Sequence, residues 1–100
     1  MVQGHVDAVG TVRSCDRSGD PVLLDVEVPA IVADTTVLHG SIAIDGVSLT
    51  VNALPGPGLV QVALIPYTLE HTTLDSLVPG SRVNLEADMI GKYVHQLANR

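Results

Sequence analysis

The feature of this sequence that most limits its fold is an alternation of apolar side chains with a period of two, which recurs in several short segments. Apolar residues occupy every second position, with mainly polar residues between them, over 22–28, 60–64 and 83–87. A weaker form runs from about His5 to Arg13. This period places successive side chains on opposite faces of a β-strand. The sequence therefore predicts short strands, each with one buried face.

The alternation changes parity at Asp45-Gly46. Apolar residues fall on even positions before this dipeptide and on odd positions after it. Asp-Gly between two apolar alternations is typical of a two-residue hairpin, in which both turn residues adopt positive φ. We therefore predict strands over 41–44 and 47–52, joined by a tight turn. The polar face of the second strand then carries three small hydrogen-bonding side chains, Ser48, Thr50 and Asn52.

Turns and short helices separate the alternating segments. Gly- and Pro-containing turns are expected at 17–21, 55–58 and 79–80. Pro29 suits the start of a short helical turn, and one or two further turns of helix are expected around 68–77. Apolar residues at helical spacing between 89 and 97 predict a C-terminal helix. Short strands, tight turns and one terminal helix indicate an all-β fold, a small antiparallel barrel.

Composition excludes several functional classes. The chain has 100 residues, a net charge of -6 and only five Lys and Arg, so binding to nucleic acid through its phosphates is not expected. No apolar run is long enough to span a membrane, so we expect no membrane partner and a cytoplasmic location. A single cysteine, Cys15, excludes an internal disulfide, and the four histidines lack metal-site spacing, so no metal is expected.

Two stretches contain groups that could bind a small molecule. The first is the polar face formed by Ser48, Thr50 and Asn52. This face is either an ordinary solvent-exposed side of a strand or a row of hydrogen-bonding groups that binds a flat polar heterocycle. In 64–74, Pro66 ends a strand, and the polar residues after it either cap a short helix or present a binding corner. Both interpretations remain open for each stretch.

Two ionisable residues near the ends of the pattern are candidates for proton transfer. His5 precedes the first alternating segment, and a histidine near a chain end is often only an exposed polar residue. Asp88 follows the last alternating segment, where it could instead cap the C-terminal helix.

Four stretches in order resemble riboflavin synthase, and specifically its C-terminal lumazine-binding barrel: VQGHVDAVGTV, GSIAIDGVSLTVN, LIPYTLEHTTL and GSRVNLEADMIGKYV. The resemblance covers nearly the whole chain and implies a single domain over 1–100, a six-stranded Greek-key barrel. It also implies a pteridine or flavin ligand: 6,7-dimethyl-8-ribityllumazine, riboflavin or a related flavin. In that family two lumazine molecules exchange a four-carbon unit to give riboflavin, and no metal or redox cofactor is required.

The resemblance assigns roles to individual positions. The residues that it implies for ligand contact are Gly4, His5, Val6, His39, Ser48, Leu49, Thr50, Ile65, Pro66, Tyr67, Thr68, Leu69 and Glu70. The residues that it implies for catalysis are His5, Asp88 and Ser48.

The sequence also departs from the family pattern. His39 stands where the family usually has Lys, Tyr67 where it has His or Glu, His71 where it has Arg, and Ala8 where it has Gly. The family's N-terminal barrel, with a Ser and a Cys at the hairpin corresponding to Ser48, is absent from this chain.

Three functional hypotheses follow from this pattern of matches and departures. The chain is a binding module for a lumazine or flavin, a riboflavin synthase-type enzyme acting as a homo-oligomer, or an excised half of a longer enzyme. Because one barrel cannot form the family's two-barrel site, a homodimer or homotrimer is expected.

Overall fold

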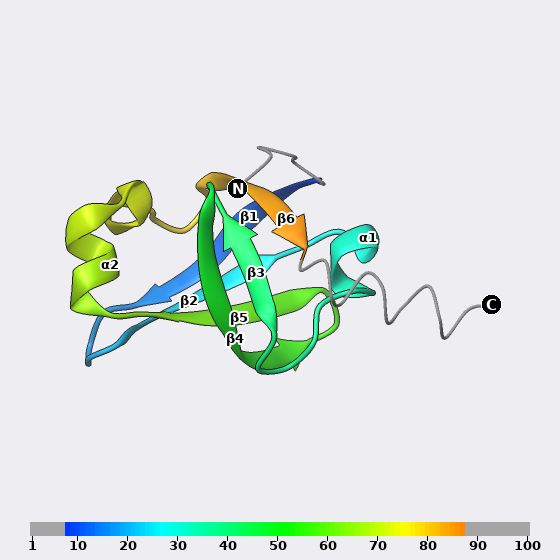
Figure 1. The fold of residues 1–100 in the computed structure, drawn as a ribbon, viewed down its shortest axis with the longest axis horizontal. Coiled ribbons are helices and arrows are strands. Elements are labelled where there is room, and N and C mark those ends of the chain that lie inside the picture. Colours follow the sequence, from blue (N-terminus) through cyan, green and yellow to red (C-terminus); the bar gives the residue numbers. More distant parts are fainter. Residues whose placement is uncertain (1–7, 88–100) are drawn as a thin grey trace.

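In the computed structural model, which describes residues 8–87, six antiparallel strands close into a barrel (Figure 1). The strands are β1 (Ala8–Asp16), β2 (Val22–Glu27), β3 (Ser41–Ile44), β4 (Val47–Gly56), β5 (Leu59–Leu64) and β6 (Arg82–Ala87). Around the barrel they follow the order β1-β2-β5-β4-β3-β6. Since β3, β4 and β5 are joined as hairpins and β6 returns beside β3, the topology is a Greek key. The all-β, six-stranded Greek-key barrel predicted from the sequence is confirmed.

The alternating apolar residues fill the interior of the barrel. β2 and β5 pair along their whole length, and the facing pairs Leu24–Val62 and Val26–Val60 are at most 1% exposed. The inward residues of β6 are buried in the same way. The core is therefore almost entirely aliphatic, and branched side chains suit the pleated surface of a small barrel.

The β3–β4 hairpin explains the change in parity at Asp45-Gly46. Both residues have positive φ, 49° and 83°, as a two-residue turn of this kind requires. Ile44 pairs with Val47, and Ile42 pairs with Leu49. A loop of two residues puts an even position of one strand opposite an odd position of the next, so both apolar sets face the interior.

The end of β1 differs from the expectation of a strand ending near Arg13. Within the described residues, β1 begins at Ala8 and continues to Asp16, and its pairing with β2 shifts register between Val12 and Ser14. This bulge reverses the alternation, because after the buried Val12 it is Cys15 that packs against the core. The sequence pattern breaks at the bulge, although the strand does not.

The turn expected at 55–58 is also shorter than predicted. β4 runs through Gly56, and only Pro57 and Gly58 form the turn to β5. The pairing of β4 with β5 shifts register between Ala53 and Gly56, which accommodates Pro55 inside the strand. The turn predicted at 79–80 is confirmed, with Gly80 at φ 95°.

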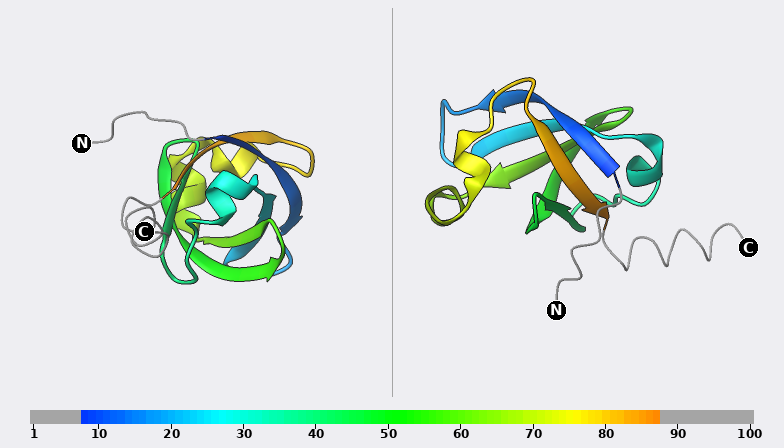
Figure 2. Two further views of the ribbon diagram at one scale, coloured as in Figure 1. Left: turned by 90° about the vertical axis from the view of Figure 1, so that its right-hand side faces the viewer. Right: turned by 90° about the horizontal axis from the view of Figure 1, so that it is seen from above.

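Short helices cover the two ends of the barrel, as expected from the sequence. α1 (Ala30–Ala33) follows Pro29 and crosses one end, where Val32 is fully buried (Figure 2, left). α2 (Pro66–His71) and the 3-10 helix η1 (Thr73–Ser76) lie at the other end, where Leu74 and Leu77 enter the core. α2 starts at Pro66, two residues before the expected stretch, because proline fits the first turn of a helix. The predicted C-terminal helix lies outside the described residues.

Candidate functional site

Two strands of the barrel change partners along their length. β1 pairs with β6 over 8–11 and with β2 over 11–16. β4 pairs with β3 over 47–50 and with β5 over 51–56. Each of these strands therefore bends away from one neighbour as it joins the other, which creates four positions where two strands diverge.

Backbone contacts fill three of these four positions. Beside β1, Val12 exchanges hydrogen bonds with Ser81 and Gly80, both of 2.8 Å. At the other end of β1, a Cβ added to Gly10 would lie 2.7 Å from the carbonyl oxygen of Glu27 on β2. Beside β4, Val51 accepts from the His39 amide at 2.9 Å and donates to Gly40 at 2.8 Å.

The fourth position has no such contact. Within residues 8–87, neither a register pair nor a hydrogen bond joins residues 47–50 of β4 to residues 63–69. β4 leaves β5 at the Val51–Val62 pair and continues toward β3, whereas β5 continues toward α2 (Figure 1). We call this divergence the β4–β5 fork. It separates the two stretches that the sequence singles out for binding.

The first stretch supplies two hydroxyl groups to the outer side of the fork. Ser48 and Thr50 are exposed on β4, and neither side chain has a hydrogen-bond partner in the part of the chain that the structure describes. Asn52 differs, since its amide nitrogen donates to Gln61 at 2.6 Å, and Gln61 donates to Asp25 at 2.9 Å. Of the three polar side chains on this face of β4, Ser48 and Thr50 thus have hydroxyls that are free within residues 8–87, whereas the Asn52 amide is bonded to the neighbouring strand β5.

Two other predicted contacts lie beside this stretch. Leu49 points into the core and is 8% exposed, so any ligand contact of this residue uses its backbone. His39 is exposed and has positive φ, 68°. Its backbone is fixed to Val51, next in sequence to Thr50.

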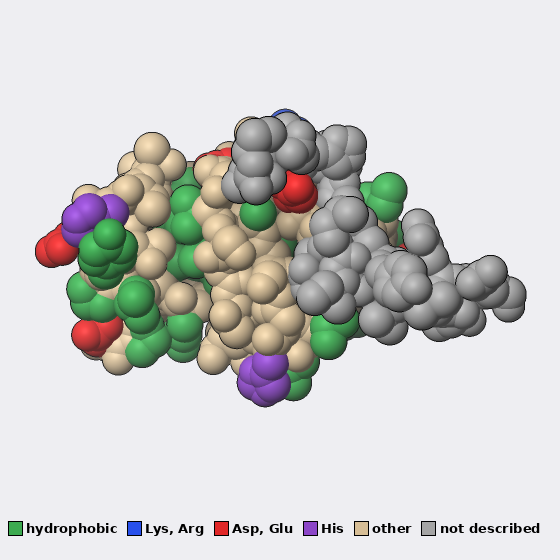
Figure 3. All heavy atoms as spheres, in the orientation of Figure 1, with side chains coloured by type: hydrophobic (Ala, Val, Ile, Leu, Met, Phe, Trp, Pro, Cys, Tyr) green, Lys and Arg blue, Asp and Glu red, His purple; other side chains and the backbone are tan. Residues whose placement is uncertain are grey.

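The second stretch forms the start of α2. Ile65 and Tyr67 are exposed, whereas Leu69 packs against the core and attaches the helix to the barrel. The Tyr67 ring stacks on His71, with centroids 4.1 Å apart and planes inclined by 18°. A hydrogen bond of 2.8 Å between Nδ1 of His71 and the Tyr67 carbonyl oxygen holds this pair. Hydrophobic and histidine side chains gather at this end of the molecule (Figure 3).

The helix-capping interpretation of this stretch holds for one threonine. Thr72 caps η1, because its hydroxyl accepts from the Leu74 amide at 3.2 Å. The same hydroxyl donates to the Thr68 carbonyl oxygen at 2.7 Å. Thr68 is not a cap, and Glu70 is exposed near the end of α2 rather than in its first turn. Pro66 occupies the first turn of a helix that has no capping side chain.

The remaining predicted residues, Gly4, His5, Val6 and Asp88, lie outside the described residues. Within 8–87 the structure groups no three His, Cys, Asp or Glu side chains in an arrangement that could hold a metal ion. In the same range, no helix has the length and apolar character needed to cross a membrane.

Comparison with known proteins places this geometry in a family. Residues 3–88 match the family model described as the lumazine binding domain. The chain belongs to the lumazine-binding domain family. Among curated relatives, the riboflavin synthase of Mycobacterium tuberculosis (strain H37Rv) is 46% identical over 99 residues, covering 97% of this chain and 49% of that protein. The riboflavin synthase of Bacillus subtilis is 37% identical over 100 residues, covering 100% of this chain and 46% of that protein.

This lumazine-binding domain thus spans about half the length of the curated relatives it matches. Among solved structures, it is similar to LumP complexed with 6,7-dimethyl-8-(1'-D-ribityl) lumazine, with a TM-score of 0.80 and 22% identity. That match covers 87% of this chain and 49% of LumP. LumP complexed with riboflavin matches equally well, with a TM-score of 0.80 over 88% of this chain and 47% of that chain. At this identity the likeness supports the fold.

Sequence reasoning missed the contacts that shape the fork. The Asn52–Gln61–Asp25 chain and the contacts of Arg17 with Asp75 join residues that are 9 to 58 positions apart. No local pattern marks such pairs, because they depend on which strands become neighbours. The Thr68–Thr72 bond is different: its spacing of four residues is that of a helical hydroxyl-to-carbonyl bond, which the sequence could have indicated.

Proposed function

We propose that this domain binds 6,7-dimethyl-8-ribityllumazine, riboflavin or a related flavin at the β4–β5 fork. The observation that carries the proposal is the family match over residues 3–88, and the geometry of the described residues supports the location. The fork combines exposed apolar side chains with a few unpartnered polar groups, which is the usual composition of a small-molecule site. The curated relatives are riboflavin synthases, and the structural neighbour LumP forms complexes with 6,7-dimethyl-8-(1'-D-ribityl) lumazine and with riboflavin.

Each side of the fork supplies a different kind of contact. Ser48 and Thr50 offer hydroxyls that donate or accept, which suits the carbonyl and hydroxyl groups of a pteridine and its ribityl chain. Ile65 and Tyr67 offer apolar and aromatic surface to the ring. Thr68, next in sequence to Tyr67, adds a half-buried hydroxyl.

The enzymatic alternative is a riboflavin synthase-type dismutation of two lumazine molecules. The 46% identity to a riboflavin synthase favours it. In this alternative His5, Asp88 and Ser48 handle protons, and catalysis depends on holding two rings in a reactive orientation. No metal or redox cofactor is required by this chemistry.

We also propose that a second copy of the domain covers the bound ring in a homodimer or homotrimer. The support is the exposure of Ile65 and Tyr67, at 54% and 66%, where β5 continues into α2. A ring bound to one open face retains water on its other side, and a second barrel removes it. Light scattering with and without riboflavin tests this, because a monomer at all concentrations with ligand bound contradicts it.

One experiment separates binding from turnover. The protein is titrated with 6,7-dimethyl-8-ribityllumazine and with riboflavin, and the lumazine sample is then followed by absorbance for hours. Quenched or shifted ligand fluorescence without a riboflavin band supports a binding module. A riboflavin band that disappears in Asp88→Ala supports the enzyme. The absence of any spectral change with either compound rejects the proposed function.

A further inference from the structure

The segment that carries one side of the fork stands outside the barrel wall. Residues 66–77 comprise α2, Thr72, η1 and Leu77, and they form most of the connection from β5 to β6. Leu74 and Leu77, in the second half of the segment, bury their side chains in the core, whereas in the first half Leu69 is partly buried against it. Tyr67 and Thr68, which face the fork in the proposed function, lie in the first half. Their position therefore depends on the packing of Leu69, and also on how α2 is held to η1 and η1 to the barrel.

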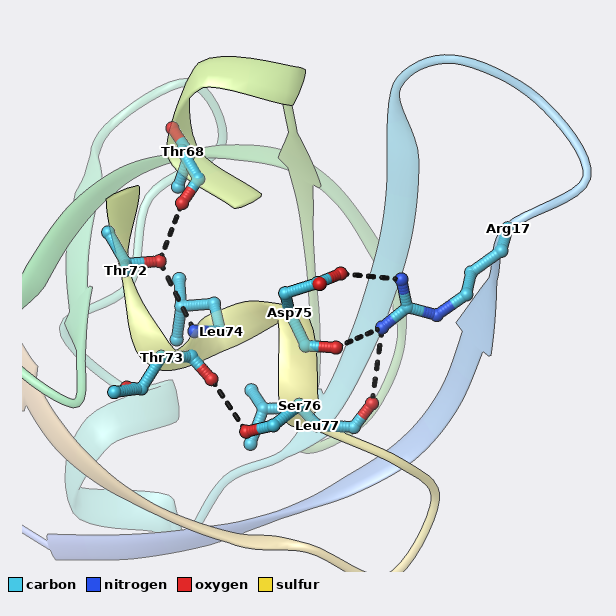
Figure 4. Close-up of polar contacts among 8 residues, drawn as sticks. All are labelled: Arg17, Thr68, Thr72, Thr73, Leu74, Asp75, Ser76 and Leu77. Atoms are coloured by element: carbon cyan, nitrogen blue, oxygen red, sulfur yellow. Dashed lines mark hydrogen bonds and ion pairs between the residues drawn. The ribbon is translucent and has the colours of Figure 1, made fainter. Parts of the chain in front are cut away.

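Within the segment, one threonine joins the two helices. The Thr72 hydroxyl donates to the Thr68 carbonyl oxygen at 2.7 Å and accepts from the Leu74 amide at 3.2 Å (Figure 4). Thr72 is half-buried, so this oxygen is partly shielded from competing water. The hydroxyl links the carbonyl side of α2 to the amide side of η1. A displacement of η1 is thereby transmitted to Thr68.

A single side chain from the β1–β2 turn contacts η1. Arg17, just after β1, donates through Nη1 to Oδ1 of Asp75 at 3.1 Å and through Nη2 to the Asp75 carbonyl oxygen at 2.8 Å (Figure 4). Nη2 also approaches the Leu77 carbonyl oxygen at 3.5 Å. The last carbonyl groups of a helix lack helical partners, and a guanidinium provides several donors in a fixed plane.

No other side chain within residues 8–87 makes such contacts with this segment. Among the described residues, Arg17 supplies every side-chain hydrogen bond between 66–77 and the rest of the barrel, and the backbone adds a bond from the Leu69 amide to the Ile65 carbonyl oxygen at 3.1 Å. Its hydrogen bond to Asp75 raises the pKa of the guanidinium, so the charge persists at any working pH.

We propose that Arg17 is a positioning residue for the ligand site, because it holds η1 and, through Thr72, sets the position of Thr68 at the β4–β5 fork. This inference rests on the proposed function. Arg17 itself contacts the segment from the side of the β1–β2 turn. Its effect on binding is therefore indirect and works through the backbone of residues 68–77.

Arg13 provides a matched control. It also lies on the β1 side and forms an exposed ion pair, with Glu27 at 3.3 Å, compared with 3.1 Å for Arg17 and Asp75. Both substitutions to alanine remove one positive charge and one surface ion pair. Arg13 has no hydrogen bond to residues 66–77. A difference in riboflavin affinity between Arg17→Ala and Arg13→Ala is therefore due to the lost contacts with residues 66–77, and not to the lost positive charge.

The experiment is a riboflavin titration of the wild type, Arg17→Ala, Arg17→Lys and Arg13→Ala, with thermal unfolding of each. We expect Arg17→Ala to weaken binding by about 3- to 10-fold, the scale of a lost hydrogen-bonding partner, and mainly through faster dissociation. Arg17→Lys keeps the charge but not the planar set of donors, and should restore part of the affinity. Arg13→Ala should bind like the wild type.

The dependence of riboflavin affinity on salt concentration is a second measurement, and a general loss of stability would not reproduce it. Riboflavin is uncharged at neutral pH, so its own binding is insensitive to ionic strength. Screening of the exposed Arg17–Asp75 pair at ~1 M salt should weaken binding to the wild type and to Arg13→Ala, but not to Arg17→Ala. Equal affinity of Arg17→Ala and the wild type overturns the inference and leaves the proposed function intact. No binding by the wild type overturns both.

Discussion

Replacement of Thr50 by valine should change ligand binding without changing stability. The Thr50 hydroxyl is exposed on β4 and has no partner within residues 8–87, and valine has nearly the same shape. Folding therefore loses no hydrogen bond, and we expect the free energy of unfolding to change by less than about 0.5 kcal/mol. A bound pteridine, by contrast, would lose a partner while remaining desolvated. That loss costs about 1–3 kcal/mol, which corresponds to about 5- to 150-fold in Kd.

The assay is a fluorescence titration with riboflavin and 6,7-dimethyl-8-ribityllumazine, together with urea unfolding of the same samples. Asn52→Ala is the matched control on the same face of β4. Its amide already bonds to Gln61, so the control should lose some stability and retain affinity. Unchanged affinity in Thr50→Val, or an equal loss in both variants, would refute the reasoning and return this face of β4 to an ordinary solvent-facing surface.

Three further predictions concern the barrel itself. Gly10→Ala places a methyl group 2.7 Å from a carbonyl oxygen of β2 and 2.7 Å from a leucine methyl of β6, so urea unfolding should show a loss of about 1–3 kcal/mol. Gly56→Ala, whose nearest neighbour is 3.7 Å away, should cost far less. Asp45→Ala leaves alanine at φ 49° and removes the carboxylate that accepts a hydrogen bond from a β6 amide at 2.8 Å. It should destabilise the hairpin by about 1–2 kcal/mol, whereas Asp45→Asn should retain most of the stability. Hydrogen bonds from the Ser18 hydroxyl and amide lower the pKa of Asp16 from its ordinary value of 3.8. The contribution of the ionised Asp16 to folding stability is therefore fully present above pH 3.8 and is lost as the pH falls through the lower pKa of the folded state. A carboxyl titration followed by NMR should show this, and Ser18→Ala should move the pKa of Asp16 back toward 3.8; an unmoved value excludes the hydroxyl as the cause.

The sequence predicts the strands well wherever one face of a strand is buried along its whole length. β2, β5 and β6 meet this condition, and their alternation is unbroken. The Asp45-Gly46 turn was predictable for a different reason, since its backbone geometry depends on those two residues alone. In both cases the determining interactions are local or periodic.

The prediction fails where a strand changes partners. The bulge after Val12 and the register shifts of β4 arise because β1 and β4 each bend to pair with two neighbouring strands. The composition of a segment does not say where such a bend falls. The same limit applies to the site. The sequence singles out Ser48, Thr50 and the 64–74 stretch, but the loss of strand pairing between them depends on closure of the barrel.

Closure of the barrel also explains why the free hydroxyls occur at this position. A barrel of six strands closes with β1 and β4 each changing partners, and each of these strands leaves one neighbour at one end and its other neighbour at the other end. At three of the four resulting positions the chain fills the gap with its own backbone, through Gly10, through Val12 with Ser81, and through His39 with Val51. At the fourth, β5 instead leads into α2, which Leu69 attaches to the core and which is followed by η1, where Arg17 bonds to Asp75. At this fork the hydroxyls of Ser48 and Thr50 are exposed and have no partner within residues 8–87, so both remain available to a ligand. A substitution that filled the fork with a large apolar side chain, such as Ser48→Phe, should therefore leave the barrel folded and abolish binding, whereas the same substitution at a buried position would unfold it.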